Sequence, residues 1–134
     1  MLDNKNIALA LEENAGRRAS HPAIIEGDRT IPYSELDSLV RRIAGHLGDQ
    51  GIGEGAIVGV CLRDSANHLM VLYAVARLGA VILPLDWRWT GPEKRRVAEY
   101  FGVALVVVEA GAELVGVASI EVDGAWHAAI AKRQ

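Results

Sequence analysis

The chain has 134 residues, of which 51% are hydrophobic and 23% are charged, and its formal net charge is −3 at pH 7. This length suits one domain with its own hydrophobic core, and this composition excludes an intrinsically disordered chain. The slight acidic excess argues against a nucleic-acid-binding protein, which would normally carry clustered Lys and Arg. Every apolar run is far shorter than the roughly 18 residues that a membrane span needs, so we expect none.

The first helix is predicted from Asp3 or Asn4, either of which can cap it, to about Ala15. Acidic residues on this helix, Glu12 and Glu13, are interpreted as part of a solvated face. The pattern therefore predicts an ordinary surface helix with no chemistry of its own.

A hairpin and a longer helix follow. Residues 23–26 and 29–33 flank Gly27-Asp28, a pair typical of a tight hairpin turn. Next, Ser34-Glu35-Leu36-Asp37 has the pattern of a capping box, with the serine at the N-cap. The helix that it begins carries one apolar stripe, made of Leu36, Leu39, Val40, Ile43 and Leu47.

Three apolar segments are predicted as buried strands, at residues 56–62, 80–83 and 104–108. The helix between the first two begins at Asp64 or Ser65 and ends at Gly79, which permits a tight turn into the next strand. Alternating strands and helices predict an α/β fold with a parallel βαβ sheet and helices on both faces.

A second capping box, Thr90-Gly91-Pro92-Glu93, predicts a helix between the second and third strands. On this helix Val97, Tyr100 and Phe101 are expected to point inward, with the basic residues solvated. A last strand at 119–122 and a short helix at 125–131 are also expected.

The chain is divided into a helix and hairpin (1–33), a βαβ core (34–110) and a weakly patterned tail (111–134). No linker separates these parts, so one incomplete subdomain is expected rather than several domains.

The single cysteine, Cys61, lies in an apolar run and is interpreted as a small buried hydrophobic residue. One cysteine cannot form a disulfide within the chain, so a cytoplasmic location is the default expectation. None of the four histidines has the spacing of a metal ligand, so no metal site is predicted. The histidines are His21, His46, His68 and His127.

Candidate contact residues lie in the loop after the second strand, because open α/β sheets bind ligands at the carboxyl ends of their strands. Asp86 there is either a turn-capping residue or a ligand contact. Trp87, Arg88 and Trp89 follow, and two tryptophans beside a guanidinium could stack on a planar ligand. They could equally pack against a neighbouring domain or subunit.

Two motifs together resemble the adenylate-forming (AMP-binding) enzyme superfamily. Ile31-Pro32-Tyr33-Ser34-Glu35-Leu36 is similar to its "T-Y-x-E-L" motif, and residues 78–86, LGAVILPLD, are similar to its "K-A-G-A-x-x-V-P-L" motif. Their order and spacing also match, over residues 5–110. The resemblance implies that Tyr33, Glu35, Leu36, Gly79 and Pro84 are scaffold residues.

The superfamily comprises acyl- and aryl-CoA synthetases, adenylation domains of peptide synthetases, and luciferases. The run at residues 85–90, LDWRWT, is most similar to acyl-CoA synthetases (fatty-acid–CoA ligases). The resemblance therefore implies a parent enzyme that uses ATP, magnesium and CoA to activate a carboxylic acid.

Other motifs of this superfamily do not occur in the sequence. These are the phosphate loop ending in P-K-G, the adenine and ribose motifs, and the C-terminal domain with its lysine. We therefore expect an N-terminal fragment, cut from a longer gene product or truncated, that is inactive, has no catalytic or cofactor-binding residue and needs no cofactor.

Two alternatives stay open. The chain could be a stand-alone binding module that self-associates through apolar surface or a free strand edge. It could also bind a dinucleotide, although residues 51–55, GIGEG, follow a predicted helix and open a strand, the reverse of a dinucleotide fingerprint.

Overall fold

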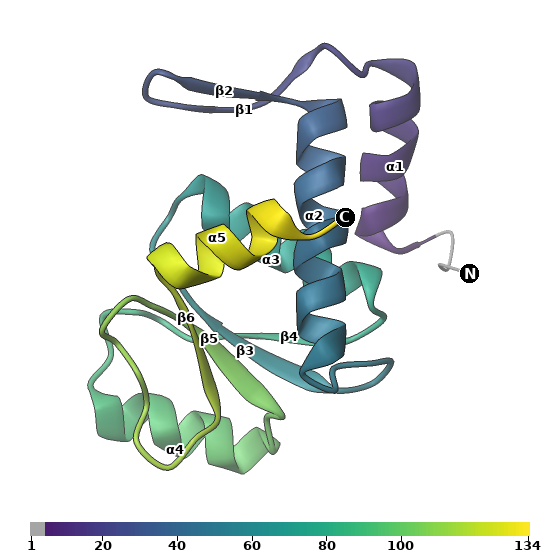
Figure 1. Cartoon of the computed structure of the whole chain (residues 1–134). Coiled ribbons are helices and arrows are strands. Elements are labelled where there is room, and N and C mark those ends of the chain that lie inside the picture. The colour runs from purple at the N-terminus through teal and green to yellow at the C-terminus, as the bar shows by residue number, and fades with distance from the viewer. Residues whose placement is uncertain (1–4) are drawn as a thin grey trace.

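The structure is a computed structural model, and residues 5–134 of it are described. Four strands form the larger sheet. Figure 1 shows helices on both sides of it and a hairpin that projects from one end of the second helix, away from the first helix. The elements are α1 (Ile7–Arg17), β1 (Pro22–Glu26), β2 (Arg29–Pro32), α2 (Tyr33–Asp49), β3 (Ile57–Cys61), α3 (Ala66–Arg77), β4 (Val81–Pro84), α4 (Gly91–Phe101), β5 (Leu105–Glu109), β6 (Ser119–Val122) and α5 (Gly124–Lys132).

All neighbouring strands of the larger sheet run parallel, in the order β4-β3-β5-β6, so the predicted fold class is confirmed. In the central register Val58 lies opposite both Ile82 and Leu105. The central strands β3 and β5 are buried, as their apolar sequences predict. Strand β4 was expected to be buried too, but it forms an edge of the sheet and leaves Val81 49% exposed. A continuous apolar run looks the same in the sequence whether the strand is central or lies at an edge of the sheet.

The hydrophobic core lies mainly on one face of the sheet. Helices α2, α3 and α5 cover that face, while the other is covered by α4 and by the segment after β5 that contains Leu114 (Figure 1). The α2 stripe is buried as predicted except for Leu39, which is half-buried against the cluster, and α1 adds Leu11 to the same cluster. On the α4 face a smaller cluster contains Cys61, Leu85, Ala98, Val106, Val108 and Leu114.

Of the two predicted capping boxes, one is present in the structure and one is not. At α4, Thr90 Oγ1 accepts from Glu93 N at 3.2 Å and Glu93 Oε2 accepts from Thr90 N at 3.1 Å, so this capping box is confirmed. The Ser34 box is wrong, because α2 begins at Tyr33 and has no side-chain cap. Instead, Tyr33 N and Ser34 N donate to the carbonyls of His21 and Ala19, both at 3.0 Å.

Helix α3 is capped by two separate segments. Ser65 Oγ accepts from His68 N at 3.2 Å, which confirms Ser65 as the cap. Glu26 at the end of β1 accepts from Ala66 N at 2.6 Å, so the hairpin is fastened to the first turn of α3. At the other end Gly79 has φ +70°, where a side chain would be strained, which confirms the predicted turn.

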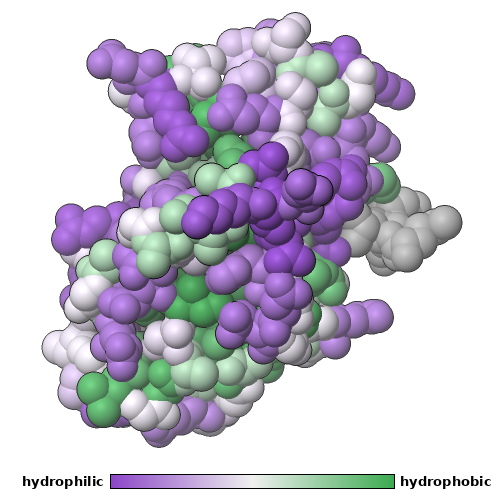
Figure 2. All heavy atoms as spheres, in the orientation of Figure 1, coloured by the Kyte–Doolittle hydropathy of each residue, from purple (hydrophilic) through white to green (hydrophobic). Residues whose placement is uncertain are grey.

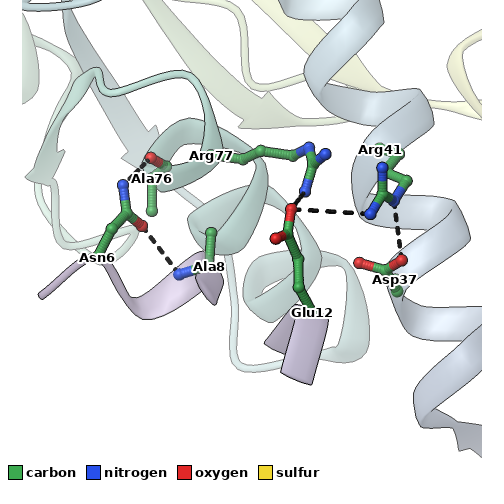
Figure 3. A network of polar contacts seen from close by, with 7 residues as sticks. All are labelled: Asn6, Ala8, Glu12, Asp37, Arg41, Ala76 and Arg77. Carbon is green, nitrogen blue, oxygen red and sulfur yellow. Dashed lines mark hydrogen bonds and ion pairs between the residues drawn. The ribbon is translucent and has the colours of Figure 1, made fainter. Parts of the chain in front are cut away.

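Helix α1 is tied to α2 and α3 by the polar network in Figure 3. Its predicted caps, Asp3 and Asn4, lie outside the described residues. The described cap is Asn6, whose Oδ1 accepts from Ala8 N at 2.9 Å and whose Nδ2 donates to the Ala76 carbonyl at 2.7 Å.

The centre of this network is Glu12, which was expected to be solvated. Its carboxylate instead pairs with Arg77 on α3, and its Oε1 lies 3.7 Å from Nη2 of Arg41 on α2. Arg41 also donates to Asp37 at 2.8 Å, and this hydrogen bond raises the pKa of Arg41. Because helical spacing cannot show which charges meet across helices, only the fold identifies this pairing.

Candidate functional site at the carboxyl ends of the strands

A groove of about 540 Å³ lies where β3 and β4 end, at the edge of the sheet predicted to carry contact residues. Parallel strands place the loops that follow them at one edge, so residues from two separate loops meet here. The groove is lined by Leu62, Asp64, His68, Pro84, Leu85 and residues 86–89. The predicted contact loop therefore forms one wall, whereas Asp64 and His68, about 20 positions earlier, form the other.

Asp86 acts within this loop as a turn residue. Its carboxylate accepts from Arg88 N at 2.9 Å, and both oxygens accept from the Arg88 guanidinium, at 3.0 and 2.8 Å. The Asp86 carbonyl also accepts from Trp89 N at 3.1 Å. These bonds from Arg88 lower the pKa of Asp86 to about 2, and Asp86 in turn raises the pKa of Arg88. The capping role considered for Asp86 is thus seen directly.

The Trp87–Arg88–Trp89 segment is a turn, so the extended arrangement that would point both indoles the same way is not present. The cation over the Trp87 ring is Arg63, whose Cζ lies 4.2 Å from the ring centroid. Arg88 is instead engaged with Asp86. Trp87 and Trp89 remain 40% and 39% exposed, which leaves surface for a ligand or a partner.

Sequence reasoning missed Asp64 and His68 on the far wall, and it missed Arg63, which contacts the groove through Trp87. Arg63 lies two residues after Cys61, the last residue of β3, and its backbone N donates to Glu109 Oε1 at 2.8 Å, which joins the end of β3 to the end of β5. His68 Nδ1 lies 4.0 Å from Asp64 Oδ1 on the far wall. The strand-end rule that selected Asp86 after β4 would have selected Arg63 after β3 as well.

The five scaffold residues are not brought together at this groove. Leu36 is buried in the larger core, and Tyr33 stacks on His21 with ring centroids 6.3 Å apart. Glu35 lies in the exposed first turn of α2. Gly79 and Pro84 bound β4, and Pro84 alone of the five lines the groove.

Cys61 is buried beneath α4, and this burial raises the pKa of its thiol, so it packs as the predicted hydrophobic residue. Among residues 5–134, no group of three or more His, Cys, Asp or Glu side chains could hold a metal ion. No helix in this range is long and apolar enough to cross a membrane.

This α/β subdomain matches the family model described as AMP-binding enzyme over residues 11–132. The chain belongs to the AMP-binding enzyme family, as its motifs indicated. Among curated relatives, the phosphinothricin tripeptide synthetase PhsC of Streptomyces viridochromogenes is 33% identical over 99 residues, which cover 74% of this chain and 9% of that protein. The indoleacetate–CoA ligase of Aromatoleum aromaticum is 36% identical over 87 residues, which cover 65% of this chain and 17% of that protein.

Solved structures of the family have the same fold. A fatty acyl CoA synthetase of Mycobacterium tuberculosis superposes with a TM-score of 0.87 at 24% identity, over 96% of this chain and 28% of that chain. The N-terminal subdomain of Klebsiella oxytoca NpsA gives 0.83 at 19% identity, over 97% and 32%. The chain thus has the fold of an N-terminal subdomain of adenylate-forming enzymes and spans about a third or less of these proteins.

Proposed function

We propose that the chain is the N-terminal part of an ATP-dependent, AMP-forming acyl-CoA synthetase. The observation that carries the proposal is the family match over residues 11–132. Support for the CoA branch comes from the tryptophan–arginine run at residues 85–90 and from the similarity to an indoleacetate–CoA ligase. A cytoplasmic location remains a prediction from the single buried cysteine.

The proposed reaction of the whole protein has two steps. A carboxylate oxygen attacks the α-phosphorus of ATP, and the bond to pyrophosphate breaks, giving an acyl-adenylate. The thiol of CoA then attacks the acyl carbon and loses its proton, and AMP leaves with the electrons of the broken bond. Both are acyl- or phosphoryl-centred displacements, in which positioning and charge stabilisation dominate.

This chain by itself is proposed to be inactive. Its sequence lacks the serine-, threonine- and glycine-rich phosphate loop that ends in P-K-G. Because the motifs that carry the ATP chemistry do not occur in it, no catalytic step is assigned to this chain. ATP, magnesium and CoA are assigned to the whole protein only.

The proposal is tested by ATP–pyrophosphate exchange with the purified chain and a panel of fatty and aryl acids. A complete acyl-CoA synthetase serves as the positive control. No exchange above background is expected from the chain. Robust exchange would overturn the proposed inactivity, whereas a reading frame that continues beyond codon 134 into the phosphate loop would support the proposed parent enzyme.

A second candidate is a stand-alone binding module without catalysis, favoured by the exposure of Tyr100 and Phe101 on α4. A stop codon after Gln134 with no downstream partner gene would favour this candidate. The similarity to a fatty acid–acyl-carrier-protein ligase of Streptomyces coeruleorubidus raises a different acceptor, an acyl-carrier protein, which loading assays on the whole protein would distinguish from CoA. Titration with a nicotinamide dinucleotide tests the remaining alternative, and no binding is expected.

A further inference from the structure

An apolar groove of about 530 Å³ lies between the hairpin and the start of α3. The hairpin contributes Ile24 and Ile25 to its lining, and α3 contributes Leu69 and Leu72. Ile25 is 72% exposed and Leu69 is 44% exposed. In Figure 2, hydrophobic side chains reach the surface just below the hairpin of Figure 1, between hydrophilic ones. Aliphatic side chains from two separate segments thus meet at one concave, uncovered surface.

The polar groups that line this groove have partners within the chain. Glu26 accepts from Ala66 N at 2.6 Å, and Ser65 Oγ accepts from His68 N at 3.2 Å. His68 Nδ1 lies 4.0 Å from Asp64 Oδ1. All of these contacts are at the first turn of α3, and none of the lining residues is Lys or Arg. The aliphatic part of the groove is therefore suited to apolar side chains rather than to a charged ligand.

The groove continues into a depression on either side. Ile24 and Leu69 also line a smaller pocket of about 170 Å³ that reaches α1. Towards the sheet, Asp64 and His68 also line the groove at the strand ends. One depression therefore runs from α1 past the hairpin to the loop after β4. An apolar surface of this extent with a polar rim is typical of an interface.

The hairpin over this groove is positioned but only partly covered. Strands β1 and β2 form a sheet of their own, and such a hairpin needs further strands or a packed helix for stability. Tyr33 N donates to the His21 carbonyl at 3.0 Å at one end, and Glu26 is bonded to α3 at the other. Ile31 of β2 is fully buried, whereas Ile25 of β1 is not. Because the groove is already formed, filling it would cost little conformational entropy.

Isolated N-terminal units of related proteins are much larger than this chain. The chain covers 32% of the solved N-terminal subdomain of Klebsiella oxytoca NpsA and 36% of the solved N-terminal domain of FACL13 of Mycobacterium tuberculosis. Nearly the whole of this chain, 97%, superposes on each. A compact unit of that size is held together by apolar surface buried between its parts. The remaining two thirds of such a unit would therefore pack on apolar surface that this chain leaves open.

The outer face of α4 is a poorer surface for that contact. The sequence predicts that Tyr100 and Phe101 point inward, but they are 82% and 49% exposed, so the prediction is wrong for Tyr100 and only half met by Phe101. Arg96 and Glu99 beside them are exposed as well. Covering this face would take both charges out of water, which costs free energy that the aliphatic groove does not require.

We propose that, in the whole protein, the groove between the hairpin and α3 is filled by apolar side chains from the part of the N-terminal subdomain that follows residue 134. This inference rests on the proposed function, because it needs the longer protein. In the 134-residue chain the same groove is open to water.

Thiol labelling at single introduced cysteines tests the proposal, in the 134-residue chain and in the whole protein expressed from its complete reading frame. Ile25→Cys and Leu69→Cys should react with N-ethylmaleimide about tenfold or more slowly in the whole protein than in the 134-residue chain, because burial protects a thiol. The native Cys61 is 3% exposed and should react slowly in both. Peptide mass spectrometry gives the rate at each position.

The matched control is Val115→Cys, at an apolar residue that is 75% exposed and lies outside the groove. Its rate should be the same in both proteins, and far-UV circular dichroism confirms that each variant keeps its fold. Equal rates for Ile25→Cys and Leu69→Cys in the two proteins would overturn the proposal. Protection of Val115→Cys without protection of Ile25→Cys would overturn it too, by placing the contact elsewhere.

The labelling needs no substrate, so its outcome is independent of the enzymatic proposal. ATP–pyrophosphate exchange by the whole protein without protection of the groove would overturn this inference and keep the proposed function. Protection without exchange would do the reverse. A reading frame that ends after Gln134 would overturn this inference as well, because no following segment would exist.

Discussion

The two faces of the parallel sheet are covered very differently. On one face α2, α3 and α5, with α1 behind them, build a continuous core from β3 and β5 outward. On the other, α4 fully buries only Ala98 and lies over a small cluster, leaving Tyr100 in solvent. The first face holds the fold together, whereas on the second Tyr100 and Phe101, both expected to point inward, stay exposed.

The largest expected effect on stability is on the face of the sheet that α2, α3 and α5 cover. Ile43 on α2 is 1% exposed in the larger core, so Ile43→Ala should lower the free energy of unfolding by about 2–5 kcal/mol. Tyr100→Ser, on the face that α4 covers, should change the free energy of unfolding by less than about 0.5 kcal/mol. Urea denaturation measures both, and equal losses would contradict the unequal division of the core.

Helix α4 depends on its own ends because it buries so little. Removing its cap with Thr90→Ala should lower the free energy of unfolding by about 1 kcal/mol. Ser34→Ala is the matched control, because Ser34 makes no cap and the change should stay within about 0.5 kcal/mol. A larger loss at Ser34 than at Thr90 in thermal or urea denaturation would reverse this assignment.

Ion pairs hold α1 against α2 and α3. Glu12→Gln removes the pairs with Arg77 and Arg41 and should lower the free energy of unfolding by up to about 1 kcal/mol. The difference should shrink in high salt because these groups are partly exposed. Glu13→Gln, at an exposed neighbour, should have no measurable effect, and a loss that is independent of salt would argue against an ionic tie.

The smallest effect concerns the strand-end loop. The pKa of Asp86 is lowered from 3.8 to about 2 by Arg88, so the folded state binds this proton less readily than the unfolded chain. The pair therefore contributes stability above about pH 4 and loses it as the pH falls towards 2. A carboxyl-carbon NMR titration should place the Asp86 midpoint near pH 2, and Arg88→Met should return it towards 3.8. An unchanged midpoint would show that Arg88 is not the cause.

Much of the fold could be predicted because local rules decide it. The α2 stripe, the buried strands β3 and β5, the turn at Gly79 and the Thr90 capping box each depend on a few neighbouring residues. Of the candidate site, the wall formed by the loop after β4 was predicted and the residues that follow β3 were not. Asp86 and the tryptophans were located by the strand-end rule, whereas the Arg63 partner of Trp87 follows a different strand.

The amino-acid sequence by itself determined the family, the order of the elements and the burial of Cys61. These depend on motif order, hydrophobic period and composition, which are properties of the chain alone. The tertiary structure decided that β4 is an edge, that Glu12 is paired and that Tyr100 points outward. The orientation of a helix and the place of a strand depend on which surfaces meet, and only the packed chain brings those surfaces together.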